Sequence, residues 1–96
     1  MIDAVVPFSR ALLASASAAG CSAIIEATTA CDWASATFTG QQHRLHLRIP
    51  AGPATTAWLA ALPELEWRLP RNLVAHIAAE MSGDRTIVTA FTIHEA

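Results

Sequence analysis

The sequence predicts an α+β domain over residues 1–96, with antiparallel strands in one curved sheet or two small sheets and two helices packed on one face. Three observations predict this class. The length of 96 residues suits one domain with one modest core. Pro7 and Pro53 each begin a helix-compatible segment that β-compatible runs follow. Gly40 and Gly83 each separate two such runs, as the turn of a hairpin does.

The N-terminal third predicts one helix and one strand. We expect the helix from Pro7 to Ala19, because proline suits the first turn and Gly20 suits the position after the last one. Its apolar stripe is small enough to lie close on a sheet and follows helical spacing at Phe8, Ala11, Leu12, Ser15 and Ala19. A strand is expected from Cys21 to Thr29.

A first hairpin is expected between Trp33 and Ile49. Its second strand alternates apolar with basic residues, with Leu45, Leu47 and Ile49 set against Arg44, His46 and Arg48. A two-residue turn at Gly40-Gln41 brings the apolar residues of both strands onto one face and puts Trp33 opposite Arg48 on the outer face. In the alternative register, a three-residue turn buries Trp33.

The middle of the chain predicts a second helix and a short strand. We expect the helix from Ala54 to Leu62, because Pro53 precedes it and Pro63 follows it. Residues 64–69 alternate polar with apolar and predict a strand that Pro70 ends.

The last hairpin is expected from Leu73 to Ile93. Large apolar residues occupy odd positions in both of its strands, so an odd residue must face an odd residue. A three-residue turn, Ser82-Gly83-Asp84, satisfies this rule. It predicts the pairs Met81 with Arg85, Ile77 with Thr89, and Leu73 with Ile93.

The even residues of this hairpin would then form its outer face. They are Val74, His76, Ala78, Glu80, Thr86, Val88, Ala90 and Thr92. A solvated strand face is normally polar at nearly every position, whereas this one is half apolar and has no Lys or Arg. We therefore expect a homodimer, with interface candidates Val74, His76, Ala78, Val88 and Ala90. In the alternative, the first half of the chain covers this face within the monomer.

The expected order is helix, three strands, helix, three strands, an αβββαβββ-like order in which residues 5–50 and 51–96 form a weak internal repeat. Repeated α-β-β-β units resemble, in element order only, the domains of DNA sliding clamps. Clamp helices line DNA with basic residues, whereas the first predicted helix has only Arg10 and the second has no cation. The resemblance implies a clamp-like nucleic-acid accessory, which we rank last.

The composition of the chain limits the classes of partner and the cellular compartment that we expect. The chain is 53% hydrophobic and 15% charged, contains no Lys and has a net charge of −2. A low charge favours a surface covered by a partner, and a negative chain argues against nucleic-acid or acidic-membrane binding. No run approaches the ~18 apolar residues of a transmembrane helix. Cys21 and Cys31 predict buried thiols in a reducing, bacterial-type cytoplasm. Export as a lipoprotein-like precursor ending its signal at Cys21 is the alternative.

The feature with the most chemistry is the Arg44-x-His46-x-Arg48 pattern, because period two puts all three side chains on one strand face. Two guanidiniums around an imidazole suit a carboxylate or phosphate, and Trp33 beside them would stack on a flat ligand. Trp33, Arg44, His46 and Arg48 are therefore the candidates for binding a small anion. His43 and His46 point to opposite faces of the strand, so no metal site is expected there.

The sequence contains no GxSxG, P-loop, GxGxxG or HExxH motif, so we assign no catalytic residue and no cofactor. The first hypothesis is a non-enzymatic homo-oligomeric or interaction module. The alternative is a small-ligand binder or minor enzyme that uses the Trp33, Arg44, His46 and Arg48 face.

Overall fold

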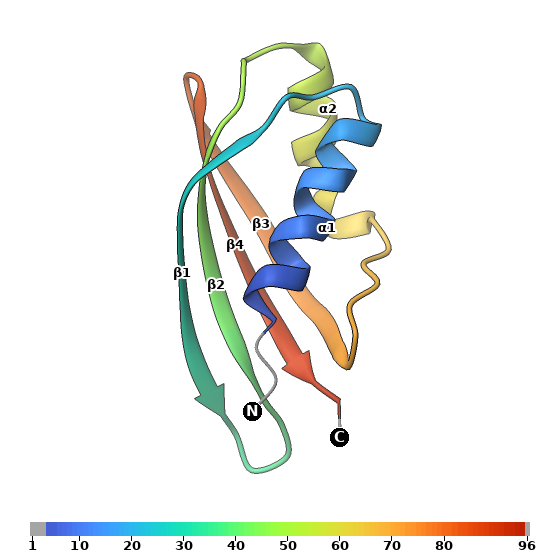
Figure 1. Ribbon diagram of the computed structural model, residues 1–96, viewed down its shortest axis with the longest axis vertical. Helices are drawn as coiled ribbons and strands as arrows, with labels where there is room; N and C mark the ends of the chain where they lie inside the picture. Colours follow the sequence, from blue (N-terminus) through green and yellow to red (C-terminus); the bar gives the residue numbers. More distant parts are fainter. Residues whose placement is uncertain (1–3, 96) are drawn as a thin grey trace.

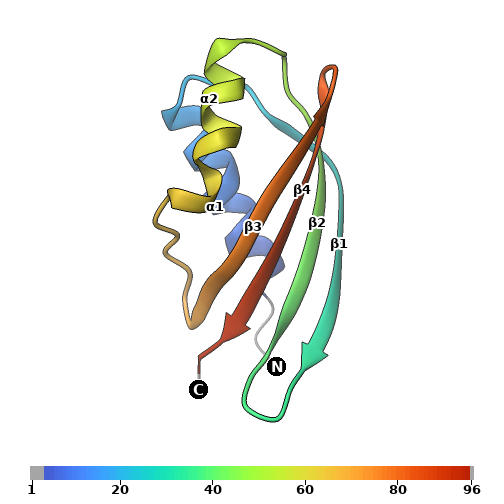
Figure 2. The same cartoon turned by 180° about the vertical axis from the view of Figure 1, so that it is seen from behind.

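The structure, a computed structural model, describes residues 4–95 and has two layers, an antiparallel sheet and two helices that cover one face of it (Figures 1 and 2). Along the chain these elements are α1 (Val5–Ala18), β1 (Ile24–Ala34), β2 (Thr39–Arg48), α2 (Pro53–Ala61), the 3-10 turn η1 (Leu62–Glu64), β3 (Asn72–Ser82) and β4 (Arg85–His94). The strand order in the sheet is β1-β2-β4-β3. The predicted α+β class, with both helices on one face, is confirmed.

Each half of the chain contributes one helix and two strands, where we predicted three strands. The predicted strand from Cys21 and the start of the first hairpin are one continuous strand, Ile24–Ala34. The predicted strand over residues 64–69 is wrong. Pro63 lies in η1, and the Trp67 indole nitrogen donates to the Leu62 carbonyl oxygen at 3.2 Å, which holds this segment against η1. With two strands per unit, the resemblance in element order to sliding-clamp domains does not hold.

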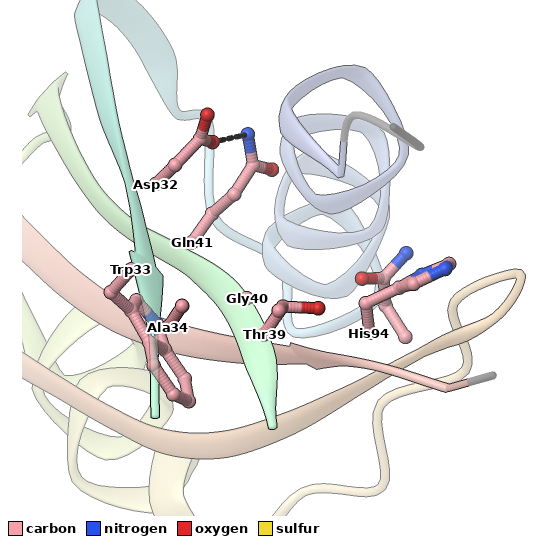
Figure 3. Close-up of a pocket in the computed structure, with 8 residues that line it drawn as sticks. Asp32, Trp33, Ala34, Thr39, Gly40, Gln41 and His94 are labelled. Atoms are coloured by element: carbon pink, nitrogen blue, oxygen red, sulfur yellow. Dashed lines mark hydrogen bonds between the residues drawn. The ribbon is translucent and has the colours of Figure 1, made fainter. Parts of the chain in front are cut away.

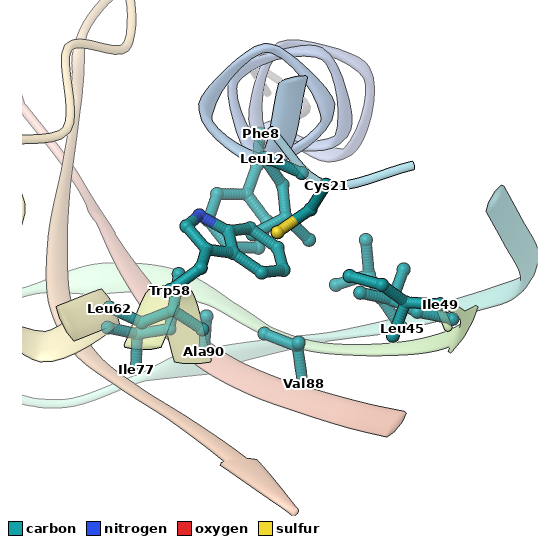
Figure 4. Close-up of a cluster of buried hydrophobic side chains, with 12 residues drawn as sticks. Phe8, Leu12, Cys21, Leu45, Ile49, Trp58, Leu62, Ile77, Val88 and Ala90 are labelled. Carbon is teal, nitrogen blue, oxygen red and sulfur yellow. The ribbon is translucent and has the colours of Figure 1, made fainter. Parts of the chain in front are cut away.

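The two helices bury one continuous core against the sheet (Figure 4). Phe8, Leu12 and Ala16 form the buried stripe of α1, and its i, i+4 spacing is that of one helix face. Trp58 of α2 is 4% exposed, and its indole nitrogen donates to the Ser15 hydroxyl at 2.9 Å. This hydrogen bond joins α2 to α1 above the sheet. No helix within residues 4–95 is long and apolar enough to cross a membrane.

The turn between β3 and β4 has two residues, not three. Ser82 pairs with Arg85, and Gly83 has a φ of 64°, which glycine adopts without steric cost at the first position of such a turn. Relative to the prediction this shifts the pairing by one residue, so Met81 faces Thr86 and Ile77 faces Ala90. A bulge between Val74 and His76 then restores the predicted pair of Leu73 with Ile93.

A shift of one residue exchanges the two faces of a strand. On β4 the residues Thr86, Val88, Ala90 and Thr92 therefore lie under the helices, where they are at most 1% exposed. The predicted oligomer face is wrong, because Val88 and Ala90 belong to the core and Val74 packs against it. The bulge separates His76 and Ala78 from these residues and puts them on the opposite face. The alternative is correct in that Val74, Val88 and Ala90 are covered within the monomer, although α2 of the second half covers them together with α1 of the first half.

The β1–β2 hairpin also turns at a different place. Ala34 pairs with Thr39, so the turn comprises residues 35–38 and the predicted turn at Gly40-Gln41 is wrong. The Ser35 hydroxyl accepts a hydrogen bond from the Phe38 N–H at 3.0 Å, and serine is well suited to this local role. Trp33 therefore pairs with Gly40, not with Arg48.

Candidate functional site

Within residues 4–95 no helix covers the second face of the sheet, which we call the open face (Figures 1 and 2). Pairing and strand periodicity assign side chains from all four strands to it. They are Ile24, Ala27, Thr29, Cys31 and Trp33 of β1; Gln42, Arg44, His46 and Arg48 of β2; Arg85, Ile87, Thr89, Phe91 and Ile93 of β4; and Leu73, His76, Ala78, Glu80 and Ser82 of β3.

One end of the open face is apolar. Trp33, Gly40, Ile93 and Leu73 form one row across the four strands. Leu73 is 52% exposed, and Trp33 and Ile93 are half-buried. In the next row, the ring of His76 lies against Phe91 with 6.0 Å between ring centroids. Cys31 and Gln42 belong to this second row. We call the two rows together the apolar end.

The other end of the open face is charged. Arg44, His46 and Arg48 share this face, as predicted. The Nη2 atom of Arg48 lies 2.9 Å from Oε2 of Glu26, and these side chains are 52% and 34% exposed. A pair this exposed contributes little to stability. However, Glu26 occupies the Arg48 guanidinium, which a small anion would have to bind.

The predicted anion site does not assemble as a unit. Trp33 pairs with Gly40, eight residues from Arg48 along β2, which corresponds to ~27 Å in a strand. The indole therefore cannot stack on a ligand held by Arg48. Sequence reasoning also missed Glu26 as a partner of Arg48, because the register shift between Ile25 and Ala27 displaces it from regular pairing.

The histidines of β2 lie on opposite faces, as the strand periodicity predicts. His43 is 0% exposed on the helix side, with its ring 5.3 Å from that of Phe8, whereas His46 lies on the open face. Within the described residues, no group of three or more His, Cys, Asp or Glu side chains could hold a metal ion. Cys21 is buried as predicted, but the prediction is wrong for Cys31, which is exposed at the sheet edge.

A pocket that the sequence did not predict lies at the end of the sheet, next to the start of α1 (Figure 3). Its volume is about 450 Å³. Its lining comprises Asp32, Trp33, Ala34, Thr39, Gly40, Gln41, Asn72 and His94, and we call it the His94 pocket. These residues come from four strands and from distant parts of the chain, so no local sequence pattern indicates the pocket. No protein-family model, curated protein or solved structure matches the chain.

Proposed function

We propose that the protein is a non-enzymatic interaction module that forms a homodimer through its open face. One observation carries the proposal: in the described part of the chain, the open face presents large apolar side chains to solvent. Ile24 is 62% exposed and Leu73 is 52% exposed, and between them Ile87, Phe91 and Ile93 of β4 are half-buried. Large exposed apolar patches on a small domain mark interaction sites.

The size of the open face fits a dimer interface. Four strands spaced ~4.8 Å apart and ten residues long make a flat area of about 650 Å². Stable protein interfaces bury about 800 Å² on each partner, and protruding side chains add to the flat area. The apolar end is two of the five rows of paired residues on this face, so the proposed dimer uses the charged end as well.

The charges of the open face favour a second copy of this chain as the occupant. Arg44, Arg48 and Arg85 lie on the face together with Glu80, and Glu26 forms an ion pair with Arg48. A face with both signs can pair with itself, whereas a nucleic-acid surface needs a predominance of cations. We place the dimer in a cytoplasm of bacterial type, because Cys21 and Cys31 are both free thiols.

Cys31 provides a test of which face is covered. It is exposed on the open face, whereas Cys21 is buried, so a maleimide should label Cys31 in the folded monomer. The dimer covers Cys31, and its labelling rate should fall as the protein concentration rises. A Cys31→Ser/Ala14→Cys variant, with its thiol on the exposed side of α1, should label at a rate that does not change with concentration. A constant rate for Cys31 would refute the proposed interface.

A further inference from the structure

The His94 pocket is lined from both faces of the sheet, with Asp32 and Gln41 on the helix side and Trp33 in the apolar end of the open face. Figure 3 shows Asp32 and Gln41 extending to the α1 side of the hairpin, whereas the Trp33 indole extends to the opposite side. The volume of about 450 Å³ is within the range of small-molecule sites. A ligand held by Asp32 would therefore lie on the helix side of this pocket.

The Asp32 carboxylate is held in a fixed orientation. The side-chain nitrogen of Gln41 donates to Asp32 Oδ1 at 3.1 Å, and the side-chain oxygen of Gln41 accepts the N–H of Ala4 at 2.9 Å. Gln41 is thus anchored at the start of α1 and orients the carboxylate in turn. Within the described residues, no Arg or His forms an ion pair with Asp32. Within these residues the carboxylate has no cationic partner, and its second oxygen can accept a hydrogen bond.

The opposite side of the pocket also offers acceptors. The Nδ1 atom of His94 is buried and has no hydrogen-bond partner within the described residues. Asn72 is 4% exposed, and its side-chain nitrogen donates to the Pro70 carbonyl oxygen at 3.0 Å, which leaves its side-chain oxygen as an acceptor. Buried polar atoms without partners are rare, and each calls for an explanation.

We propose that the His94 pocket binds a small organic cation, an alkylamine or alkylguanidine. Its N–H groups donate to the Asp32 carboxylate, and His94 lines the same pocket. Hydrogen bonds between ionised groups are stronger than neutral ones, and Asp32 is the only carboxylate in the described lining of the pocket. The same charge disfavours carboxylate and phosphate ligands.

The test is calorimetric titration with butylamine and butylguanidine, and with butanol and butyrate as neutral and anionic controls. The wild type should bind one or both cations and neither control. Asp32→Asn keeps the oxygen that accepts from Gln41 but removes the charge, so it should weaken cation binding by at least about tenfold. Asp84→Asn removes an exposed carboxylate in the β3–β4 turn and should bind as the wild type does.

A second readout locates the ligand in the pocket. The imidazole proton resonances of His94 should move in NMR spectra as the cation is added, and those of His76 on the open face should not. The proposal is overturned if neither cation binds, if Asp32→Asn binds as tightly as the wild type, or if only the His76 resonances move. Each of these results leaves the proposed dimer unaffected, because the labelling of Cys31 tests the dimer in a separate measurement.

Discussion

The Nε2 atom of His43 lies 2.9 Å from Oγ1 of Thr92, between the two central strands and on the side that the helices cover. Both side chains are 0% exposed. The Thr92 hydroxyl donates its single proton to the Gln41 carbonyl oxygen at 3.4 Å, so its oxygen accepts the proton of His43 Nε2. A hydroxyl on β4 thereby satisfies a polar ring nitrogen in the core.

Thr92→Val should destabilise the protein, because valine has nearly the same shape as threonine but removes the hydroxyl that accepts from His43 Nε2. The expected loss in the free energy of unfolding is about 1–3 kcal/mol. Thr92→Ser keeps the hydroxyl and serves as the control for this loss, apart from the small cost of a missing methyl group. Urea denaturation at constant m-value measures both variants. A Thr92→Val protein as stable as the wild type would contradict the hydrogen bond.

Val88→Arg should unfold the chain, because Val88 is 0% exposed and a guanidinium there would be a buried, unpaired charge. The expected loss exceeds about 3 kcal/mol, a large part of the stability of a small domain. Thr89→Arg changes the neighbouring residue on the open face and should give a folded protein in circular dichroism. If Val88→Arg is folded and only loses its self-association, the assignment of the two faces is inverted.

Gly40→Ala should also destabilise the protein. A Cβ atom at Gly40 would overlap the Thr92 carbonyl oxygen and would stand 2.9 Å from Cζ2 of Trp33, so strands β2 and β4 would have to separate. The expected cost is about 1–3 kcal/mol, as for other overpacked sites. Gly52→Ala is the control, since a Cβ there meets nothing within 4 Å. Its thermal midpoint should stay close to that of the wild type, and equal losses in both variants would contradict the close approach at Gly40.

Alternation in the sequence predicted faces correctly only where one face is polar. On β2 the basic residues Arg44 and Arg48 alternate with Leu45 and Leu47, and the structure puts these sets on the open and covered faces. On β4 both sets contain apolar residues, Val88 and Ala90 against Ile87 and Phe91, so alternation did not decide between them. The length of the turn at Gly83 decided which set is covered. We predicted a turn of three residues, whereas the structure has one of two.

The open face was also predictable only in part, because the period of one strand does not determine how several strands pair. The shared face of Arg44, His46 and Arg48 follows from the period of a single strand. The apolar end of the open face depends on the pairing of four strands, and two bulges in the edge strands alter that pairing. No local residue pattern in β3 indicates the bulge between Val74 and His76, which restores the pair of Leu73 with Ile93.

The measurement that tests the proposed interface most directly is sedimentation equilibrium of two matched variants. Leu73→Arg places a charge on the open face at a side chain that is 52% exposed, and Val6→Arg places it on α1 at one that is 57% exposed. Both substitutions should leave a folded protein. The wild type and Val6→Arg should sediment as dimers at high micromolar concentration, and Leu73→Arg as a monomer. A wild type that is monomeric at that concentration, or a Leu73→Arg protein that remains dimeric, would contradict the open face as the interface.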